Sequence, residues 1–350
     1  MGWMNISIAG RRIDAAEPPY IIAELSANHR GDIEQAFQLI AEAKRAGADA
    51  VKIQTYTADT ITIDHSGPGF RIEGGLWHGR TLYELYQEAH TPWDWHAELF
   101  AKARELGITI FSSPFDATAV DFLEQLNTPA YKIASFELID LPLIRKCAAQ
   151  GKPMIMSTGM ASLSEIGLAV TAARQAGASE IALLHCTSGY PTPPEEADLN
   201  TIPHLAEAFG LATGLSDHTP SIGVAIASIA LGAMIVEKHL TLRRSDGGPD
   251  AAFSLEPDEF CLLCENAHQA WKALGSVRYD KSDSEKGNVQ FRRSLYIVED
   301  IKAGDKLNER NVRSIRPGLG LEPKYIDLIL GKRINQTVSR GTPLSWDLIG

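Results

Sequence analysis

Polar side chains recur at the ends of eight apolar, strand-like segments between residues 20 and 240. One polar residue in such a place often belongs to the core, but polar residues at all eight ends indicate a common site. The set comprises Glu24, Asn28 and His29; Lys52 and Gln54; Ser112 and Ser113; Lys132, Ser135 and Glu137; Ser157 and Thr158; His185, Thr187, Ser188 and Tyr190; Ser216, Asp217 and His218; and Lys238 with His239. Because the strand interiors stay apolar, we expect these residues to surround one mouth.

Two lysines of this set, Lys52 and Lys132, suit an anionic ligand. Serine hydroxyls at or near strand ends accompany them, namely Ser113, Ser135, Ser157 and Ser216. Ammonium groups and hydroxyls are donors that bind phosphate and carboxylate oxygens. The sequence therefore predicts a local cationic pocket for a ligand that carries a phosphate and a carboxylate.

Two histidines, His218 and His239, end neighbouring predicted strands, so their imidazoles can converge on one divalent cation. Glu24 or water would complete the ligand shell and leave room for a substrate oxygen. Glu24 and Glu137 are the carboxylates of the ring, available as base, acid or stabiliser of positive charge.

The elements that position these residues alternate between short apolar runs and helical patterns, which is typical of a parallel sheet. Several helices end in glycine, such as Gly47 and Gly107, which supplies a left-handed C-cap. The predicted strands are Ile21 to Leu25, Ala50 to Gln54, Ile108 to Ser112, Ala130 to Ala134, Met154 to Ser157, Ile181 to Leu184, Ala212 to Leu215 and Met234 to Lys238. Eight such units predict an α/β fold, a (β/α)8 TIM barrel with its site at the C-terminal ends of the strands.

One connection, Tyr56 to Thr91, is far too long for an ordinary barrel loop. Loops of this length are usually lids or binding loops. It follows the second strand on the predicted catalytic face, so we expect it to cover the site.

A second, smaller unit follows the barrel. We expect a catalytic domain over residues 1–280, a polar linker over 281–292, and a C-terminal domain of short strands and turns over 293–350. The last part is marginal for an independent core, so we expect it to pack on a barrel.

Charge and composition narrow the class of protein. The net charge of -11 argues against general affinity for nucleic acid or anionic membrane. The segment from Met1 to Gly10 lacks the pattern of a signal peptide, and the longest uncharged apolar stretch, Ile222 to Val236, is too short to span a membrane. Four irregularly spaced cysteines do not form a disulfide framework, so the cytoplasm fits best.

With these residues placed, the chain resembles the sialic acid synthase family over nearly its whole length. The motifs that carry the resemblance are Ala23-Glu-Leu-Ser-Ala-Asn-His29, Val51-Lys-Ile-Gln54, Phe111-Ser-Ser-Pro-Phe115, Tyr131-Lys-Ile-Ala-Ser-Phe-Glu137, Met156-Ser-Thr-Gly-Met160, Cys186-Thr-Ser-Gly-Tyr-Pro191, Gly214-Leu-Ser-Asp-His218 and Glu237-Lys-His239. The tail, with Asp300-Ile-Lys-Ala-Gly, resembles the antifreeze-protein-like (SAF) domain of that family.

Within the family the motifs are most similar to the pseudaminic acid synthase subgroup. The supporting residues lie mainly on or beside the long second loop, for example Trp77-His-Gly-Arg-Thr-Leu-Tyr-Glu-Leu-Tyr86 and Phe115-Asp-Ala-Thr-Ala-Val-Asp121. Ser188 stands where neuraminic acid synthases usually carry an asparagine. A neuraminic or legionaminic acid synthase is the alternative within the family.

The resemblance implies condensation of phosphoenolpyruvate (PEP) with an acylated amino sugar in an enzyme that uses Mn²⁺ or Mg²⁺. It implies that His218 and His239 bind the metal. Glu24 would act at C2 of PEP, and Lys52, Lys132 and the serines would hold its phosphate and carboxylate. Glu137, Gln54, Ser188 and Tyr190 would contact the substrates, mainly the sugar.

Arg316 matches the position at which the family's SAF domain reaches into a partner's barrel. The resemblance therefore implies a homodimer with exchanged tails. A surface arginine beside a turn is the simpler interpretation, since the sequence fixes no contact between domains.

Two other functions remain open at this point. Lys52 or Lys132 could act as a Schiff-base nucleophile, as in a class I aldolase. A protein that binds carbohydrate through its tail, with the barrel as a scaffold, would leave the ring of polar strand ends unexplained.

Overall fold

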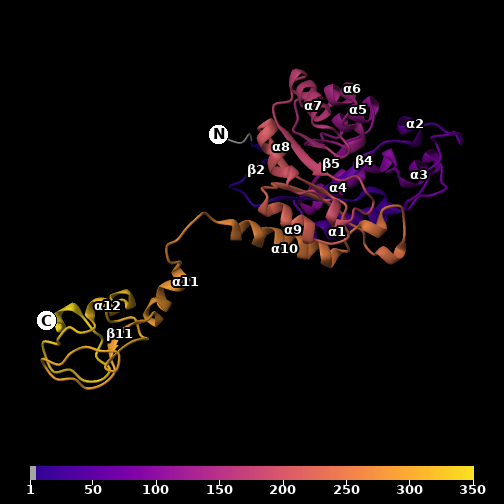
Figure 1. Ribbon diagram of the computed structural model, residues 1–350. Coiled ribbons are helices and arrows are strands. Elements are labelled where there is room, and N and C mark those ends of the chain that lie inside the picture. The colour runs from indigo at the N-terminus through magenta and orange to yellow at the C-terminus, as the bar shows by residue number, and fades with distance from the viewer. Residues whose placement is uncertain (1–4) are drawn as a thin grey trace. The chain divides into compact units, whose positions relative to one another are not determined.

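A computed structural model describes residues 5–350 of the chain (Figure 1). Residues 1–4, which begin the segment assessed above for a signal peptide, lie outside the described part. The chain divides into two compact units, Met1–Gly275 and Ser276–Gly350. The first unit contains a closed barrel of parallel strands in the order β10-β3-β4-β5-β6-β7-β8-β9, which confirms the predicted TIM barrel.

All eight predicted barrel strands are present, with small differences at their ends. They are β3 (Tyr20–Glu24), β4 (Ala50–Thr55), β5 (Thr109–Pro114), β6 (Tyr131–Ile133), β7 (Met154–Ser157), β8 (Ile181–Cys186), β9 (Ala212–Asp217) and β10 (Ile235–His239). Pairing of His239 with Glu24 and of Glu24 with Lys52 places the ends of β10, β3 and β4 at one level. This register brings the polar strand ends to a single rim.

Helices follow the strands and cover the outside of the barrel, as Figure 1 shows. They are α1 (Ile33–Ala46), α4 (His96–Leu106), α5 (Ala117–Gln125), α6 (Leu141–Ala148), α7 (Leu163–Gln175), α8 (Thr201–Phe209), α9 (Gly223–Ala230) and α10 (Pro257–Leu274). Gly47 and Gly107 end α1 and α4 in the left-handed conformation, with φ of 92° and 66°. A side chain with a Cβ is disfavoured there, which explains the two glycines.

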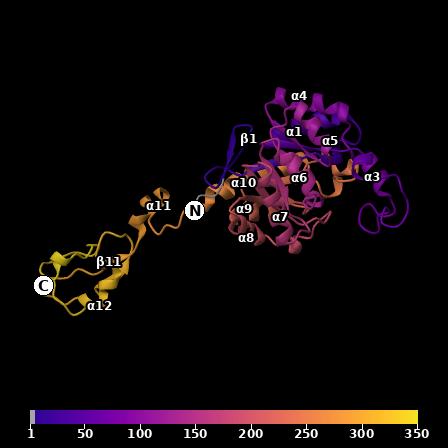
Figure 2. The ribbon, with the colours of Figure 1, turned by 90° about the horizontal axis from the view of Figure 1, so that it is seen from above.

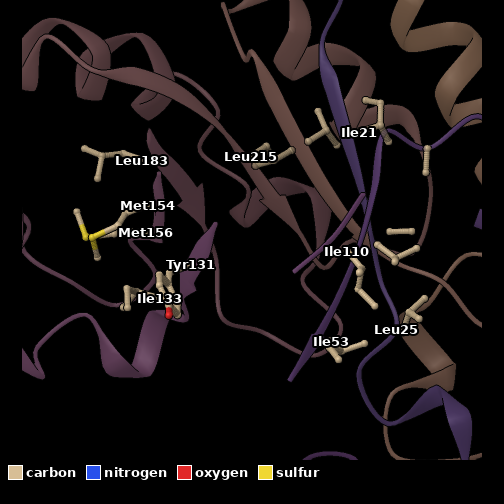
Figure 3. Close-up of a cluster of buried hydrophobic side chains, with 14 of the residues drawn as sticks. Ile21, Leu25, Ile53, Ile110, Tyr131, Ile133, Met154, Met156, Leu183 and Leu215 are labelled. Atoms are coloured by element: carbon tan, nitrogen blue, oxygen red, sulfur yellow. The ribbon is translucent and has the colours of Figure 1, made fainter. Parts of the chain in front are cut away.

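Side chains alternate between two apolar layers along each barrel strand. Ile21, Ile53, Tyr131 and Met156 belong to the larger cluster, between the strands and the helices (Figure 3). The smaller cluster fills the barrel interior with the residues of opposite parity, such as Ile155. Period-two alternation therefore decides which residues of a strand face the interior.

The sequence did not indicate the hairpin of β1 (Ile6–Ile8) and β2 (Arg11–Ile13). Its buried residues Ile6, Ile8 and Ile13 join the interior cluster that also contains Tyr20 and Ala50 at the starts of the strands. The hairpin therefore closes the N-terminal end of the barrel. Strands of three residues are too short to show a periodic signal.

The long second loop contains two helices, α2 (Ala58–Ile61) and α3 (Leu82–Ala89). In the views of Figures 1 and 2, α3 and the adjoining loop project from one side of the barrel. Thr81 caps α3, accepting a hydrogen bond from the backbone N–H of Glu84 while the Glu84 carboxylate binds the backbone N–H of Thr81. We call residues 56–91 the lid.

The second unit begins with short helical turns, α11 (Asp283–Lys286) and a 3₁₀ turn over Gly287–Phe291, within the predicted linker. β11 (Ser294–Ile297) and β12 (Val312–Ile315) then pair antiparallel, and α12 covers Ile326–Ile329. A small core of its own contains Leu295, Ile297, Ile301, Leu307, Val312, Ile329, Ile334, Leu344 and Leu348. Within the described part of the chain, no helix is both long and apolar enough to cross a membrane.

Candidate active site

A cavity of about 570 Å³ opens at the C-terminal ends of the barrel strands. Strand ends form its floor, and the lid contributes part of its wall. The structure brings together here most of the residues that the sequence indicated, namely Glu24, Lys52, Gln54, Lys132, Ser135, Glu137, Ser157, Ser188, Tyr190, Ser216, His218 and His239. Their roles remain a prediction, but their convergence on one cavity is observed.

Two lysines and two carboxylates alternate on the cavity floor. Lys52 forms an ion pair with Glu24 and lies 3.5 Å from Oε1 of Glu237. Lys132 Nζ lies 3.3 Å from Glu237 Oε2. All four side chains are almost fully buried. Removing one member would leave a buried charge without its partner, so such a change should destabilise the site.

Burial and mutual attraction set the protonation of this network. Burial lowers the pKa of Lys52, but Glu237 and Glu24 outweigh burial and leave that pKa raised. In Lys132 burial prevails and the pKa is lowered. Burial raises the pKa of Glu24, whereas Lys132 and Lys52 outweigh burial at Glu237 and lower its pKa.

Serine hydroxyls add neutral donors around the lysines. Lys52 donates to Ser113 Oγ at 3.3 Å, so Ser113 reaches the network although it does not itself line the cavity. Ser135 Oγ accepts from the backbone N–H of Gly159 at 3.2 Å. A Cβ at Gly159 would collide with the hydroxyls of Ser135 and Ser188, which explains the glycine. Lysines and hydroxyls thus form a donor-rich pocket, as expected.

The two imidazoles are close neighbours with ring centroids 5.4 Å apart. His218 Nδ1 lies 3.1 Å from the carbonyl oxygen of Thr187. A carbonyl only accepts, so Nδ1 carries a proton; burial lowers the pKa of His218, but Cys186 and the Thr187 carbonyl outweigh burial and leave that pKa raised. His239 Nδ1 is buried and has no hydrogen-bond partner among residues 5–350. Burial and then the charge of His218 lower the pKa of His239 well below its ordinary value, which keeps it neutral.

An imidazole binds a metal through a nitrogen lone pair, so His239, which is neutral, and His218, once its Nε2 carries no proton, fit a divalent cation. In the described part of the chain, no three His, Cys, Asp or Glu side chains group as a complete metal site. The remaining ligand positions would therefore fall to water or substrate, as expected for a site that binds substrate oxygen.

Three buried polar atoms of residues that line the cavity have neither a hydrogen-bond nor an ion-pair partner in the described structure. They are His239 Nδ1, Ser157 Oγ and Glu137 Oε2. Buried polar atoms are normally hydrogen-bonded, so these three indicate a ligand that is bound in use. Burial raises the pKa of Glu137 to about 7.

Some residues of the predicted ring do not line the cavity, and these expectations were wrong. Lys238 points away from the barrel interior and binds Asp217 at 2.7 Å. Ser112 donates to the Ile53 carbonyl, and His185 contacts the Ala197 carbonyl at 2.7 Å. Each neighbours an inward residue, so strand alternation turns it outward. The same correction applies to four residues beyond the strand ends that hydrogen-bond to groups outside the cavity lining, namely Asn28, His29, Thr158 and Thr187.

Sequence reasoning missed several polar residues of the cavity, Ser26 among them. Glu237 bridges the two lysines, and its position two residues before His239 gives it the same orientation, a signal that period-two counting would have found. Asp250 accepts hydrogen bonds from Ser26, but its loop offered no sequence signal. The Cys186 thiol lies 3.8 Å from His218 Nδ1; burial raises its pKa, but His218 outweighs burial and brings it to about 7.

Arg316 belongs to the second unit. It follows β12 and is exposed within that unit. Its predicted contact with a sugar in a partner's barrel remains a prediction.

Fold and cavity together define a barrel enzyme for an anionic substrate, with room for a divalent metal. The sequence matches the NeuB family over residues 39–279 and the SAF domain over residues 292–350. The chain therefore belongs to the NeuB family of PEP-dependent synthases, and it ends in an SAF domain.

Characterised relatives share most of this chain. The pseudaminic acid synthase of Helicobacter pylori is 44% identical and covers 95% of this chain and 98% of its own length. The N,N'-diacetyllegionaminic acid synthase of Legionella pneumophila is 34% identical, covering 97% of this chain and 99% of its own. A solved N-acetylneuraminic acid synthetase from Leptospira borgpetersenii superposes with a TM-score of 0.73 at 30% identity, over 83% of this chain and 96% of that one.

Proposed function

We propose that this chain is a pseudaminic acid synthase. It condenses PEP with 2,4-diacetamido-2,4,6-trideoxy-L-altrose and water to give pseudaminic acid and phosphate. The observation that carries this function is the cavity floor, where two buried lysines lie beside two imidazoles that can be neutral. The chain is also 44% identical to a pseudaminic acid synthase. The lysines suit PEP, and the imidazoles suit a metal that activates an aldehyde.

PEP would lie over the lysines, because it carries the phosphate and carboxylate that the donor-rich pocket matches. Lys52 and Lys132 would each hold one anionic group, and Ser135, Ser157 and Ser216 would donate to the remaining oxygens. Glu237 would keep both lysines oriented through its two ion pairs. This arrangement fixes C2 and C3 of PEP relative to the sugar.

Carbon–carbon bond formation would join C3 of PEP to the aldehyde carbon of the open-chain sugar, and the aldehyde oxygen would take up a proton. Positive charge develops at C2, beside the carboxylate of Glu24. Burial raises the pKa of Glu24, which strengthens it as a base for the water that adds to C2. The C2–O bond then breaks, and phosphate leaves with the bridging oxygen.

Mn²⁺ or Mg²⁺ would be held by His218 and His239, and when bound it would polarise the aldehyde as a Lewis acid. Glu137 and Tyr190 would bind the sugar from the wall of the cavity, with Gln54 and Ser188 beside them. The closed lid would exclude water other than the one that reacts.

The direct test is phosphate release from PEP with each divalent metal, comparing the altrose derivative with N-acetylmannosamine. A strong preference for the altrose derivative supports the proposal. Preference for N-acetylmannosamine assigns the chain to the neuraminic subgroup, and no release with either sugar contradicts PEP chemistry.

Two further measurements test which bond to the bridging oxygen of PEP breaks and whether a lysine forms a Schiff base. ¹⁸O placed in the bridge of PEP should appear in phosphate; its retention in the sugar product would contradict C–O cleavage. Borohydride should trap no adduct with a keto substrate, whereas an irreversible adduct on Lys52 or Lys132 would favour the aldolase alternative.

We also propose a homodimer that exchanges its SAF domains, and a cytoplasmic location. Arg316 of one subunit would then contact the sugar in the barrel of the other. The four cysteines are free thiols, in keeping with a reducing compartment.

A further inference from the structure

The cavity has two chemically different parts. Its floor is built by charged and polar strand ends, whereas one side of its mouth is apolar. We call Ile61, Ile72, Leu82, Leu85 and Phe115 the apolar wall. None of these five side chains carries a hydrogen-bonding group. Four come from the lid, and Phe115 directly follows β5.

Neighbouring contacts hold the apolar wall in place. The Trp77 indole donates to the carbonyl of Pro249 at 3.0 Å and lies against the Tyr190 ring, with centroids 5.7 Å apart. These contacts tie the lid to loops that follow β8 and β10. At the other end of the lid, Tyr56 packs edge-on against Tyr86 at 5.8 Å and Phe115 at 5.0 Å. The wall is therefore preformed over the cavity.

The direction of the sugar follows from the proposed function, on which this inference rests. If the aldehyde carbon C1 meets the two imidazoles and PEP occupies the lysine pocket, the polar floor is filled. C6 is the opposite end of the open chain, so it extends toward the mouth. The proposed substrate is deoxy at C6 and ends there in a methyl group.

We propose that the apolar wall selects sugars that lack a hydroxyl at C6. A methyl group packs against aliphatic side chains, while a hydroxyl enclosed there loses its water without gaining a partner. Tyr86, on the same helix as Leu82 and Leu85, also lines the cavity, and its hydroxyl is a polar group of the lid beside the apolar wall. Leu82 is the best residue to test, because it is only half-buried and a polar substitute can be accommodated.

Apolar pockets reject an added hydroxyl by at most about 100-fold, so we expect kcat/KM to favour the 6-deoxy sugar by about 10- to 100-fold. The experiment compares 2,4-diacetamido-2,4,6-trideoxy-L-altrose with its 6-hydroxy counterpart, by phosphate release from PEP. Leu82→Asn should lower the 6-deoxy to 6-hydroxy ratio about tenfold, mainly through the 6-deoxy sugar. Leu82→Met, which keeps an apolar side chain, should retain most of the preference.

Leu76→Asn is the matched control. Leu76 also lies in the lid, but it is 48% exposed and does not line the cavity, so its ratio should equal that of the unmodified enzyme. Equal use of the two altroses by the unmodified enzyme would overturn the inference and leave the proposed function intact. A ratio that Leu82→Asn leaves unchanged would overturn it too.

A result can also support the inference while contradicting the proposed function. If the enzyme preferred a 6-deoxy sugar of other stereochemistry, such as the manno isomer, and Leu82→Asn lowered that preference over its 6-hydroxy counterpart, the inference would hold. The proposed function would then be wrong.

Discussion

Four buried charges on the cavity floor neutralise one another before any substrate binds. Glu237 contacts both Lys52 and Lys132, so a single carboxylate orients the two cations. A phosphorylated ligand would add negative charge to a site whose lysines are already held in position. The carboxylates thus stabilise the empty site without hiding the lysines from the cavity.

Lys132→Met tests whether this cation binds PEP. We expect kcat/KM for PEP to fall by about 100-fold or more, because removal of one partner of a buried charge pair typically costs about 2–5 kcal/mol. Steady-state kinetics with PEP as the varied substrate measure the effect. Lys146→Met on the surface of α6 is the control and should change little. Unchanged PEP kinetics in a folded Lys132→Met protein would contradict the role.

Glu137 makes stability depend on pH, because burial raises its pKa from 4.5 to about 7. Between these values the unfolded chain has released the proton and the folded chain has kept it. The contribution of Glu137 to the free energy of unfolding is therefore fully present below about pH 4.5 and is lost as pH rises toward about 7. The loss should reach up to about 3 kcal/mol, since each unit of pKa shift corresponds to about 1.36 kcal/mol.

Urea unfolding across this pH range measures the effect. Glu137→Gln should lack this part of the pH dependence, while Glu98→Gln on the exposed face of α4 should retain it. Parallel stability curves for Glu137→Gln and the unmodified protein would show that Glu137 titrates normally.

At the scale of elements, β10 shows how one strand serves two purposes. Glu237 and His239 face the cavity, while Lys238 between them faces α9 and α10 and pairs with Asp217 behind the barrel wall. Lys238 also donates to the Thr219 carbonyl. The pair is fully buried, so it ties β9 to β10 rather than binding substrate.

Lys238→Met should therefore destabilise the protein by about 3–5 kcal/mol, because it leaves the buried Asp217 carboxylate unpaired. Denaturant unfolding gives the free energy directly. Combining it with Asp217→Asn should recover part of the loss, since the unpaired charge is then removed. A stable Lys238→Met protein that has lost PEP binding would instead return Lys238 to the active site.

The lid is the second element with a measurable role. Trp77→Ala removes the hydrogen bond to Pro249 and the contact with Tyr190. We expect KM for the sugar to rise about tenfold or more, with KM for PEP less affected, because each lost contact is worth roughly 1 kcal/mol. Trp77→Phe keeps an aromatic ring, so its KM for the sugar should lie between those of the unmodified enzyme and Trp77→Ala. Equal increases in both KM values would mean that the lid does not contact the sugar side specifically.

At the scale of the whole molecule, the proposed exchange of SAF domains between subunits can be tested. Exchange of domains predicts complementation between two inactive variants, Lys132→Met and Arg316→Ala. In a mixed dimer one barrel would have both Lys132 and the partner's intact tail, so co-produced chains should recover roughly a quarter of full activity. No recovery, with mixed dimers demonstrated by two affinity tags, would contradict exchange.

The sequence by itself determined the barrel and the location of the site. Eight apolar runs separated by helical patterns predict parallel strands, and polar residues at the ends of those strands must meet at one rim. Residue type and position also indicated Lys52 and His218 as site residues, because the linear order places both at strand ends.

Closure of the barrel decides which member of each adjacent polar pair faces the barrel interior. Ser113 and Ser112, or His239 and Lys238, look alike in sequence, but the register of the closed sheet turns one inward and the other toward the helices. Asp250 joins the site from a loop whose path no periodicity describes. Contacts between residues far apart in sequence depend on closure of the barrel, and closure is set by long-range packing rather than by any local pattern.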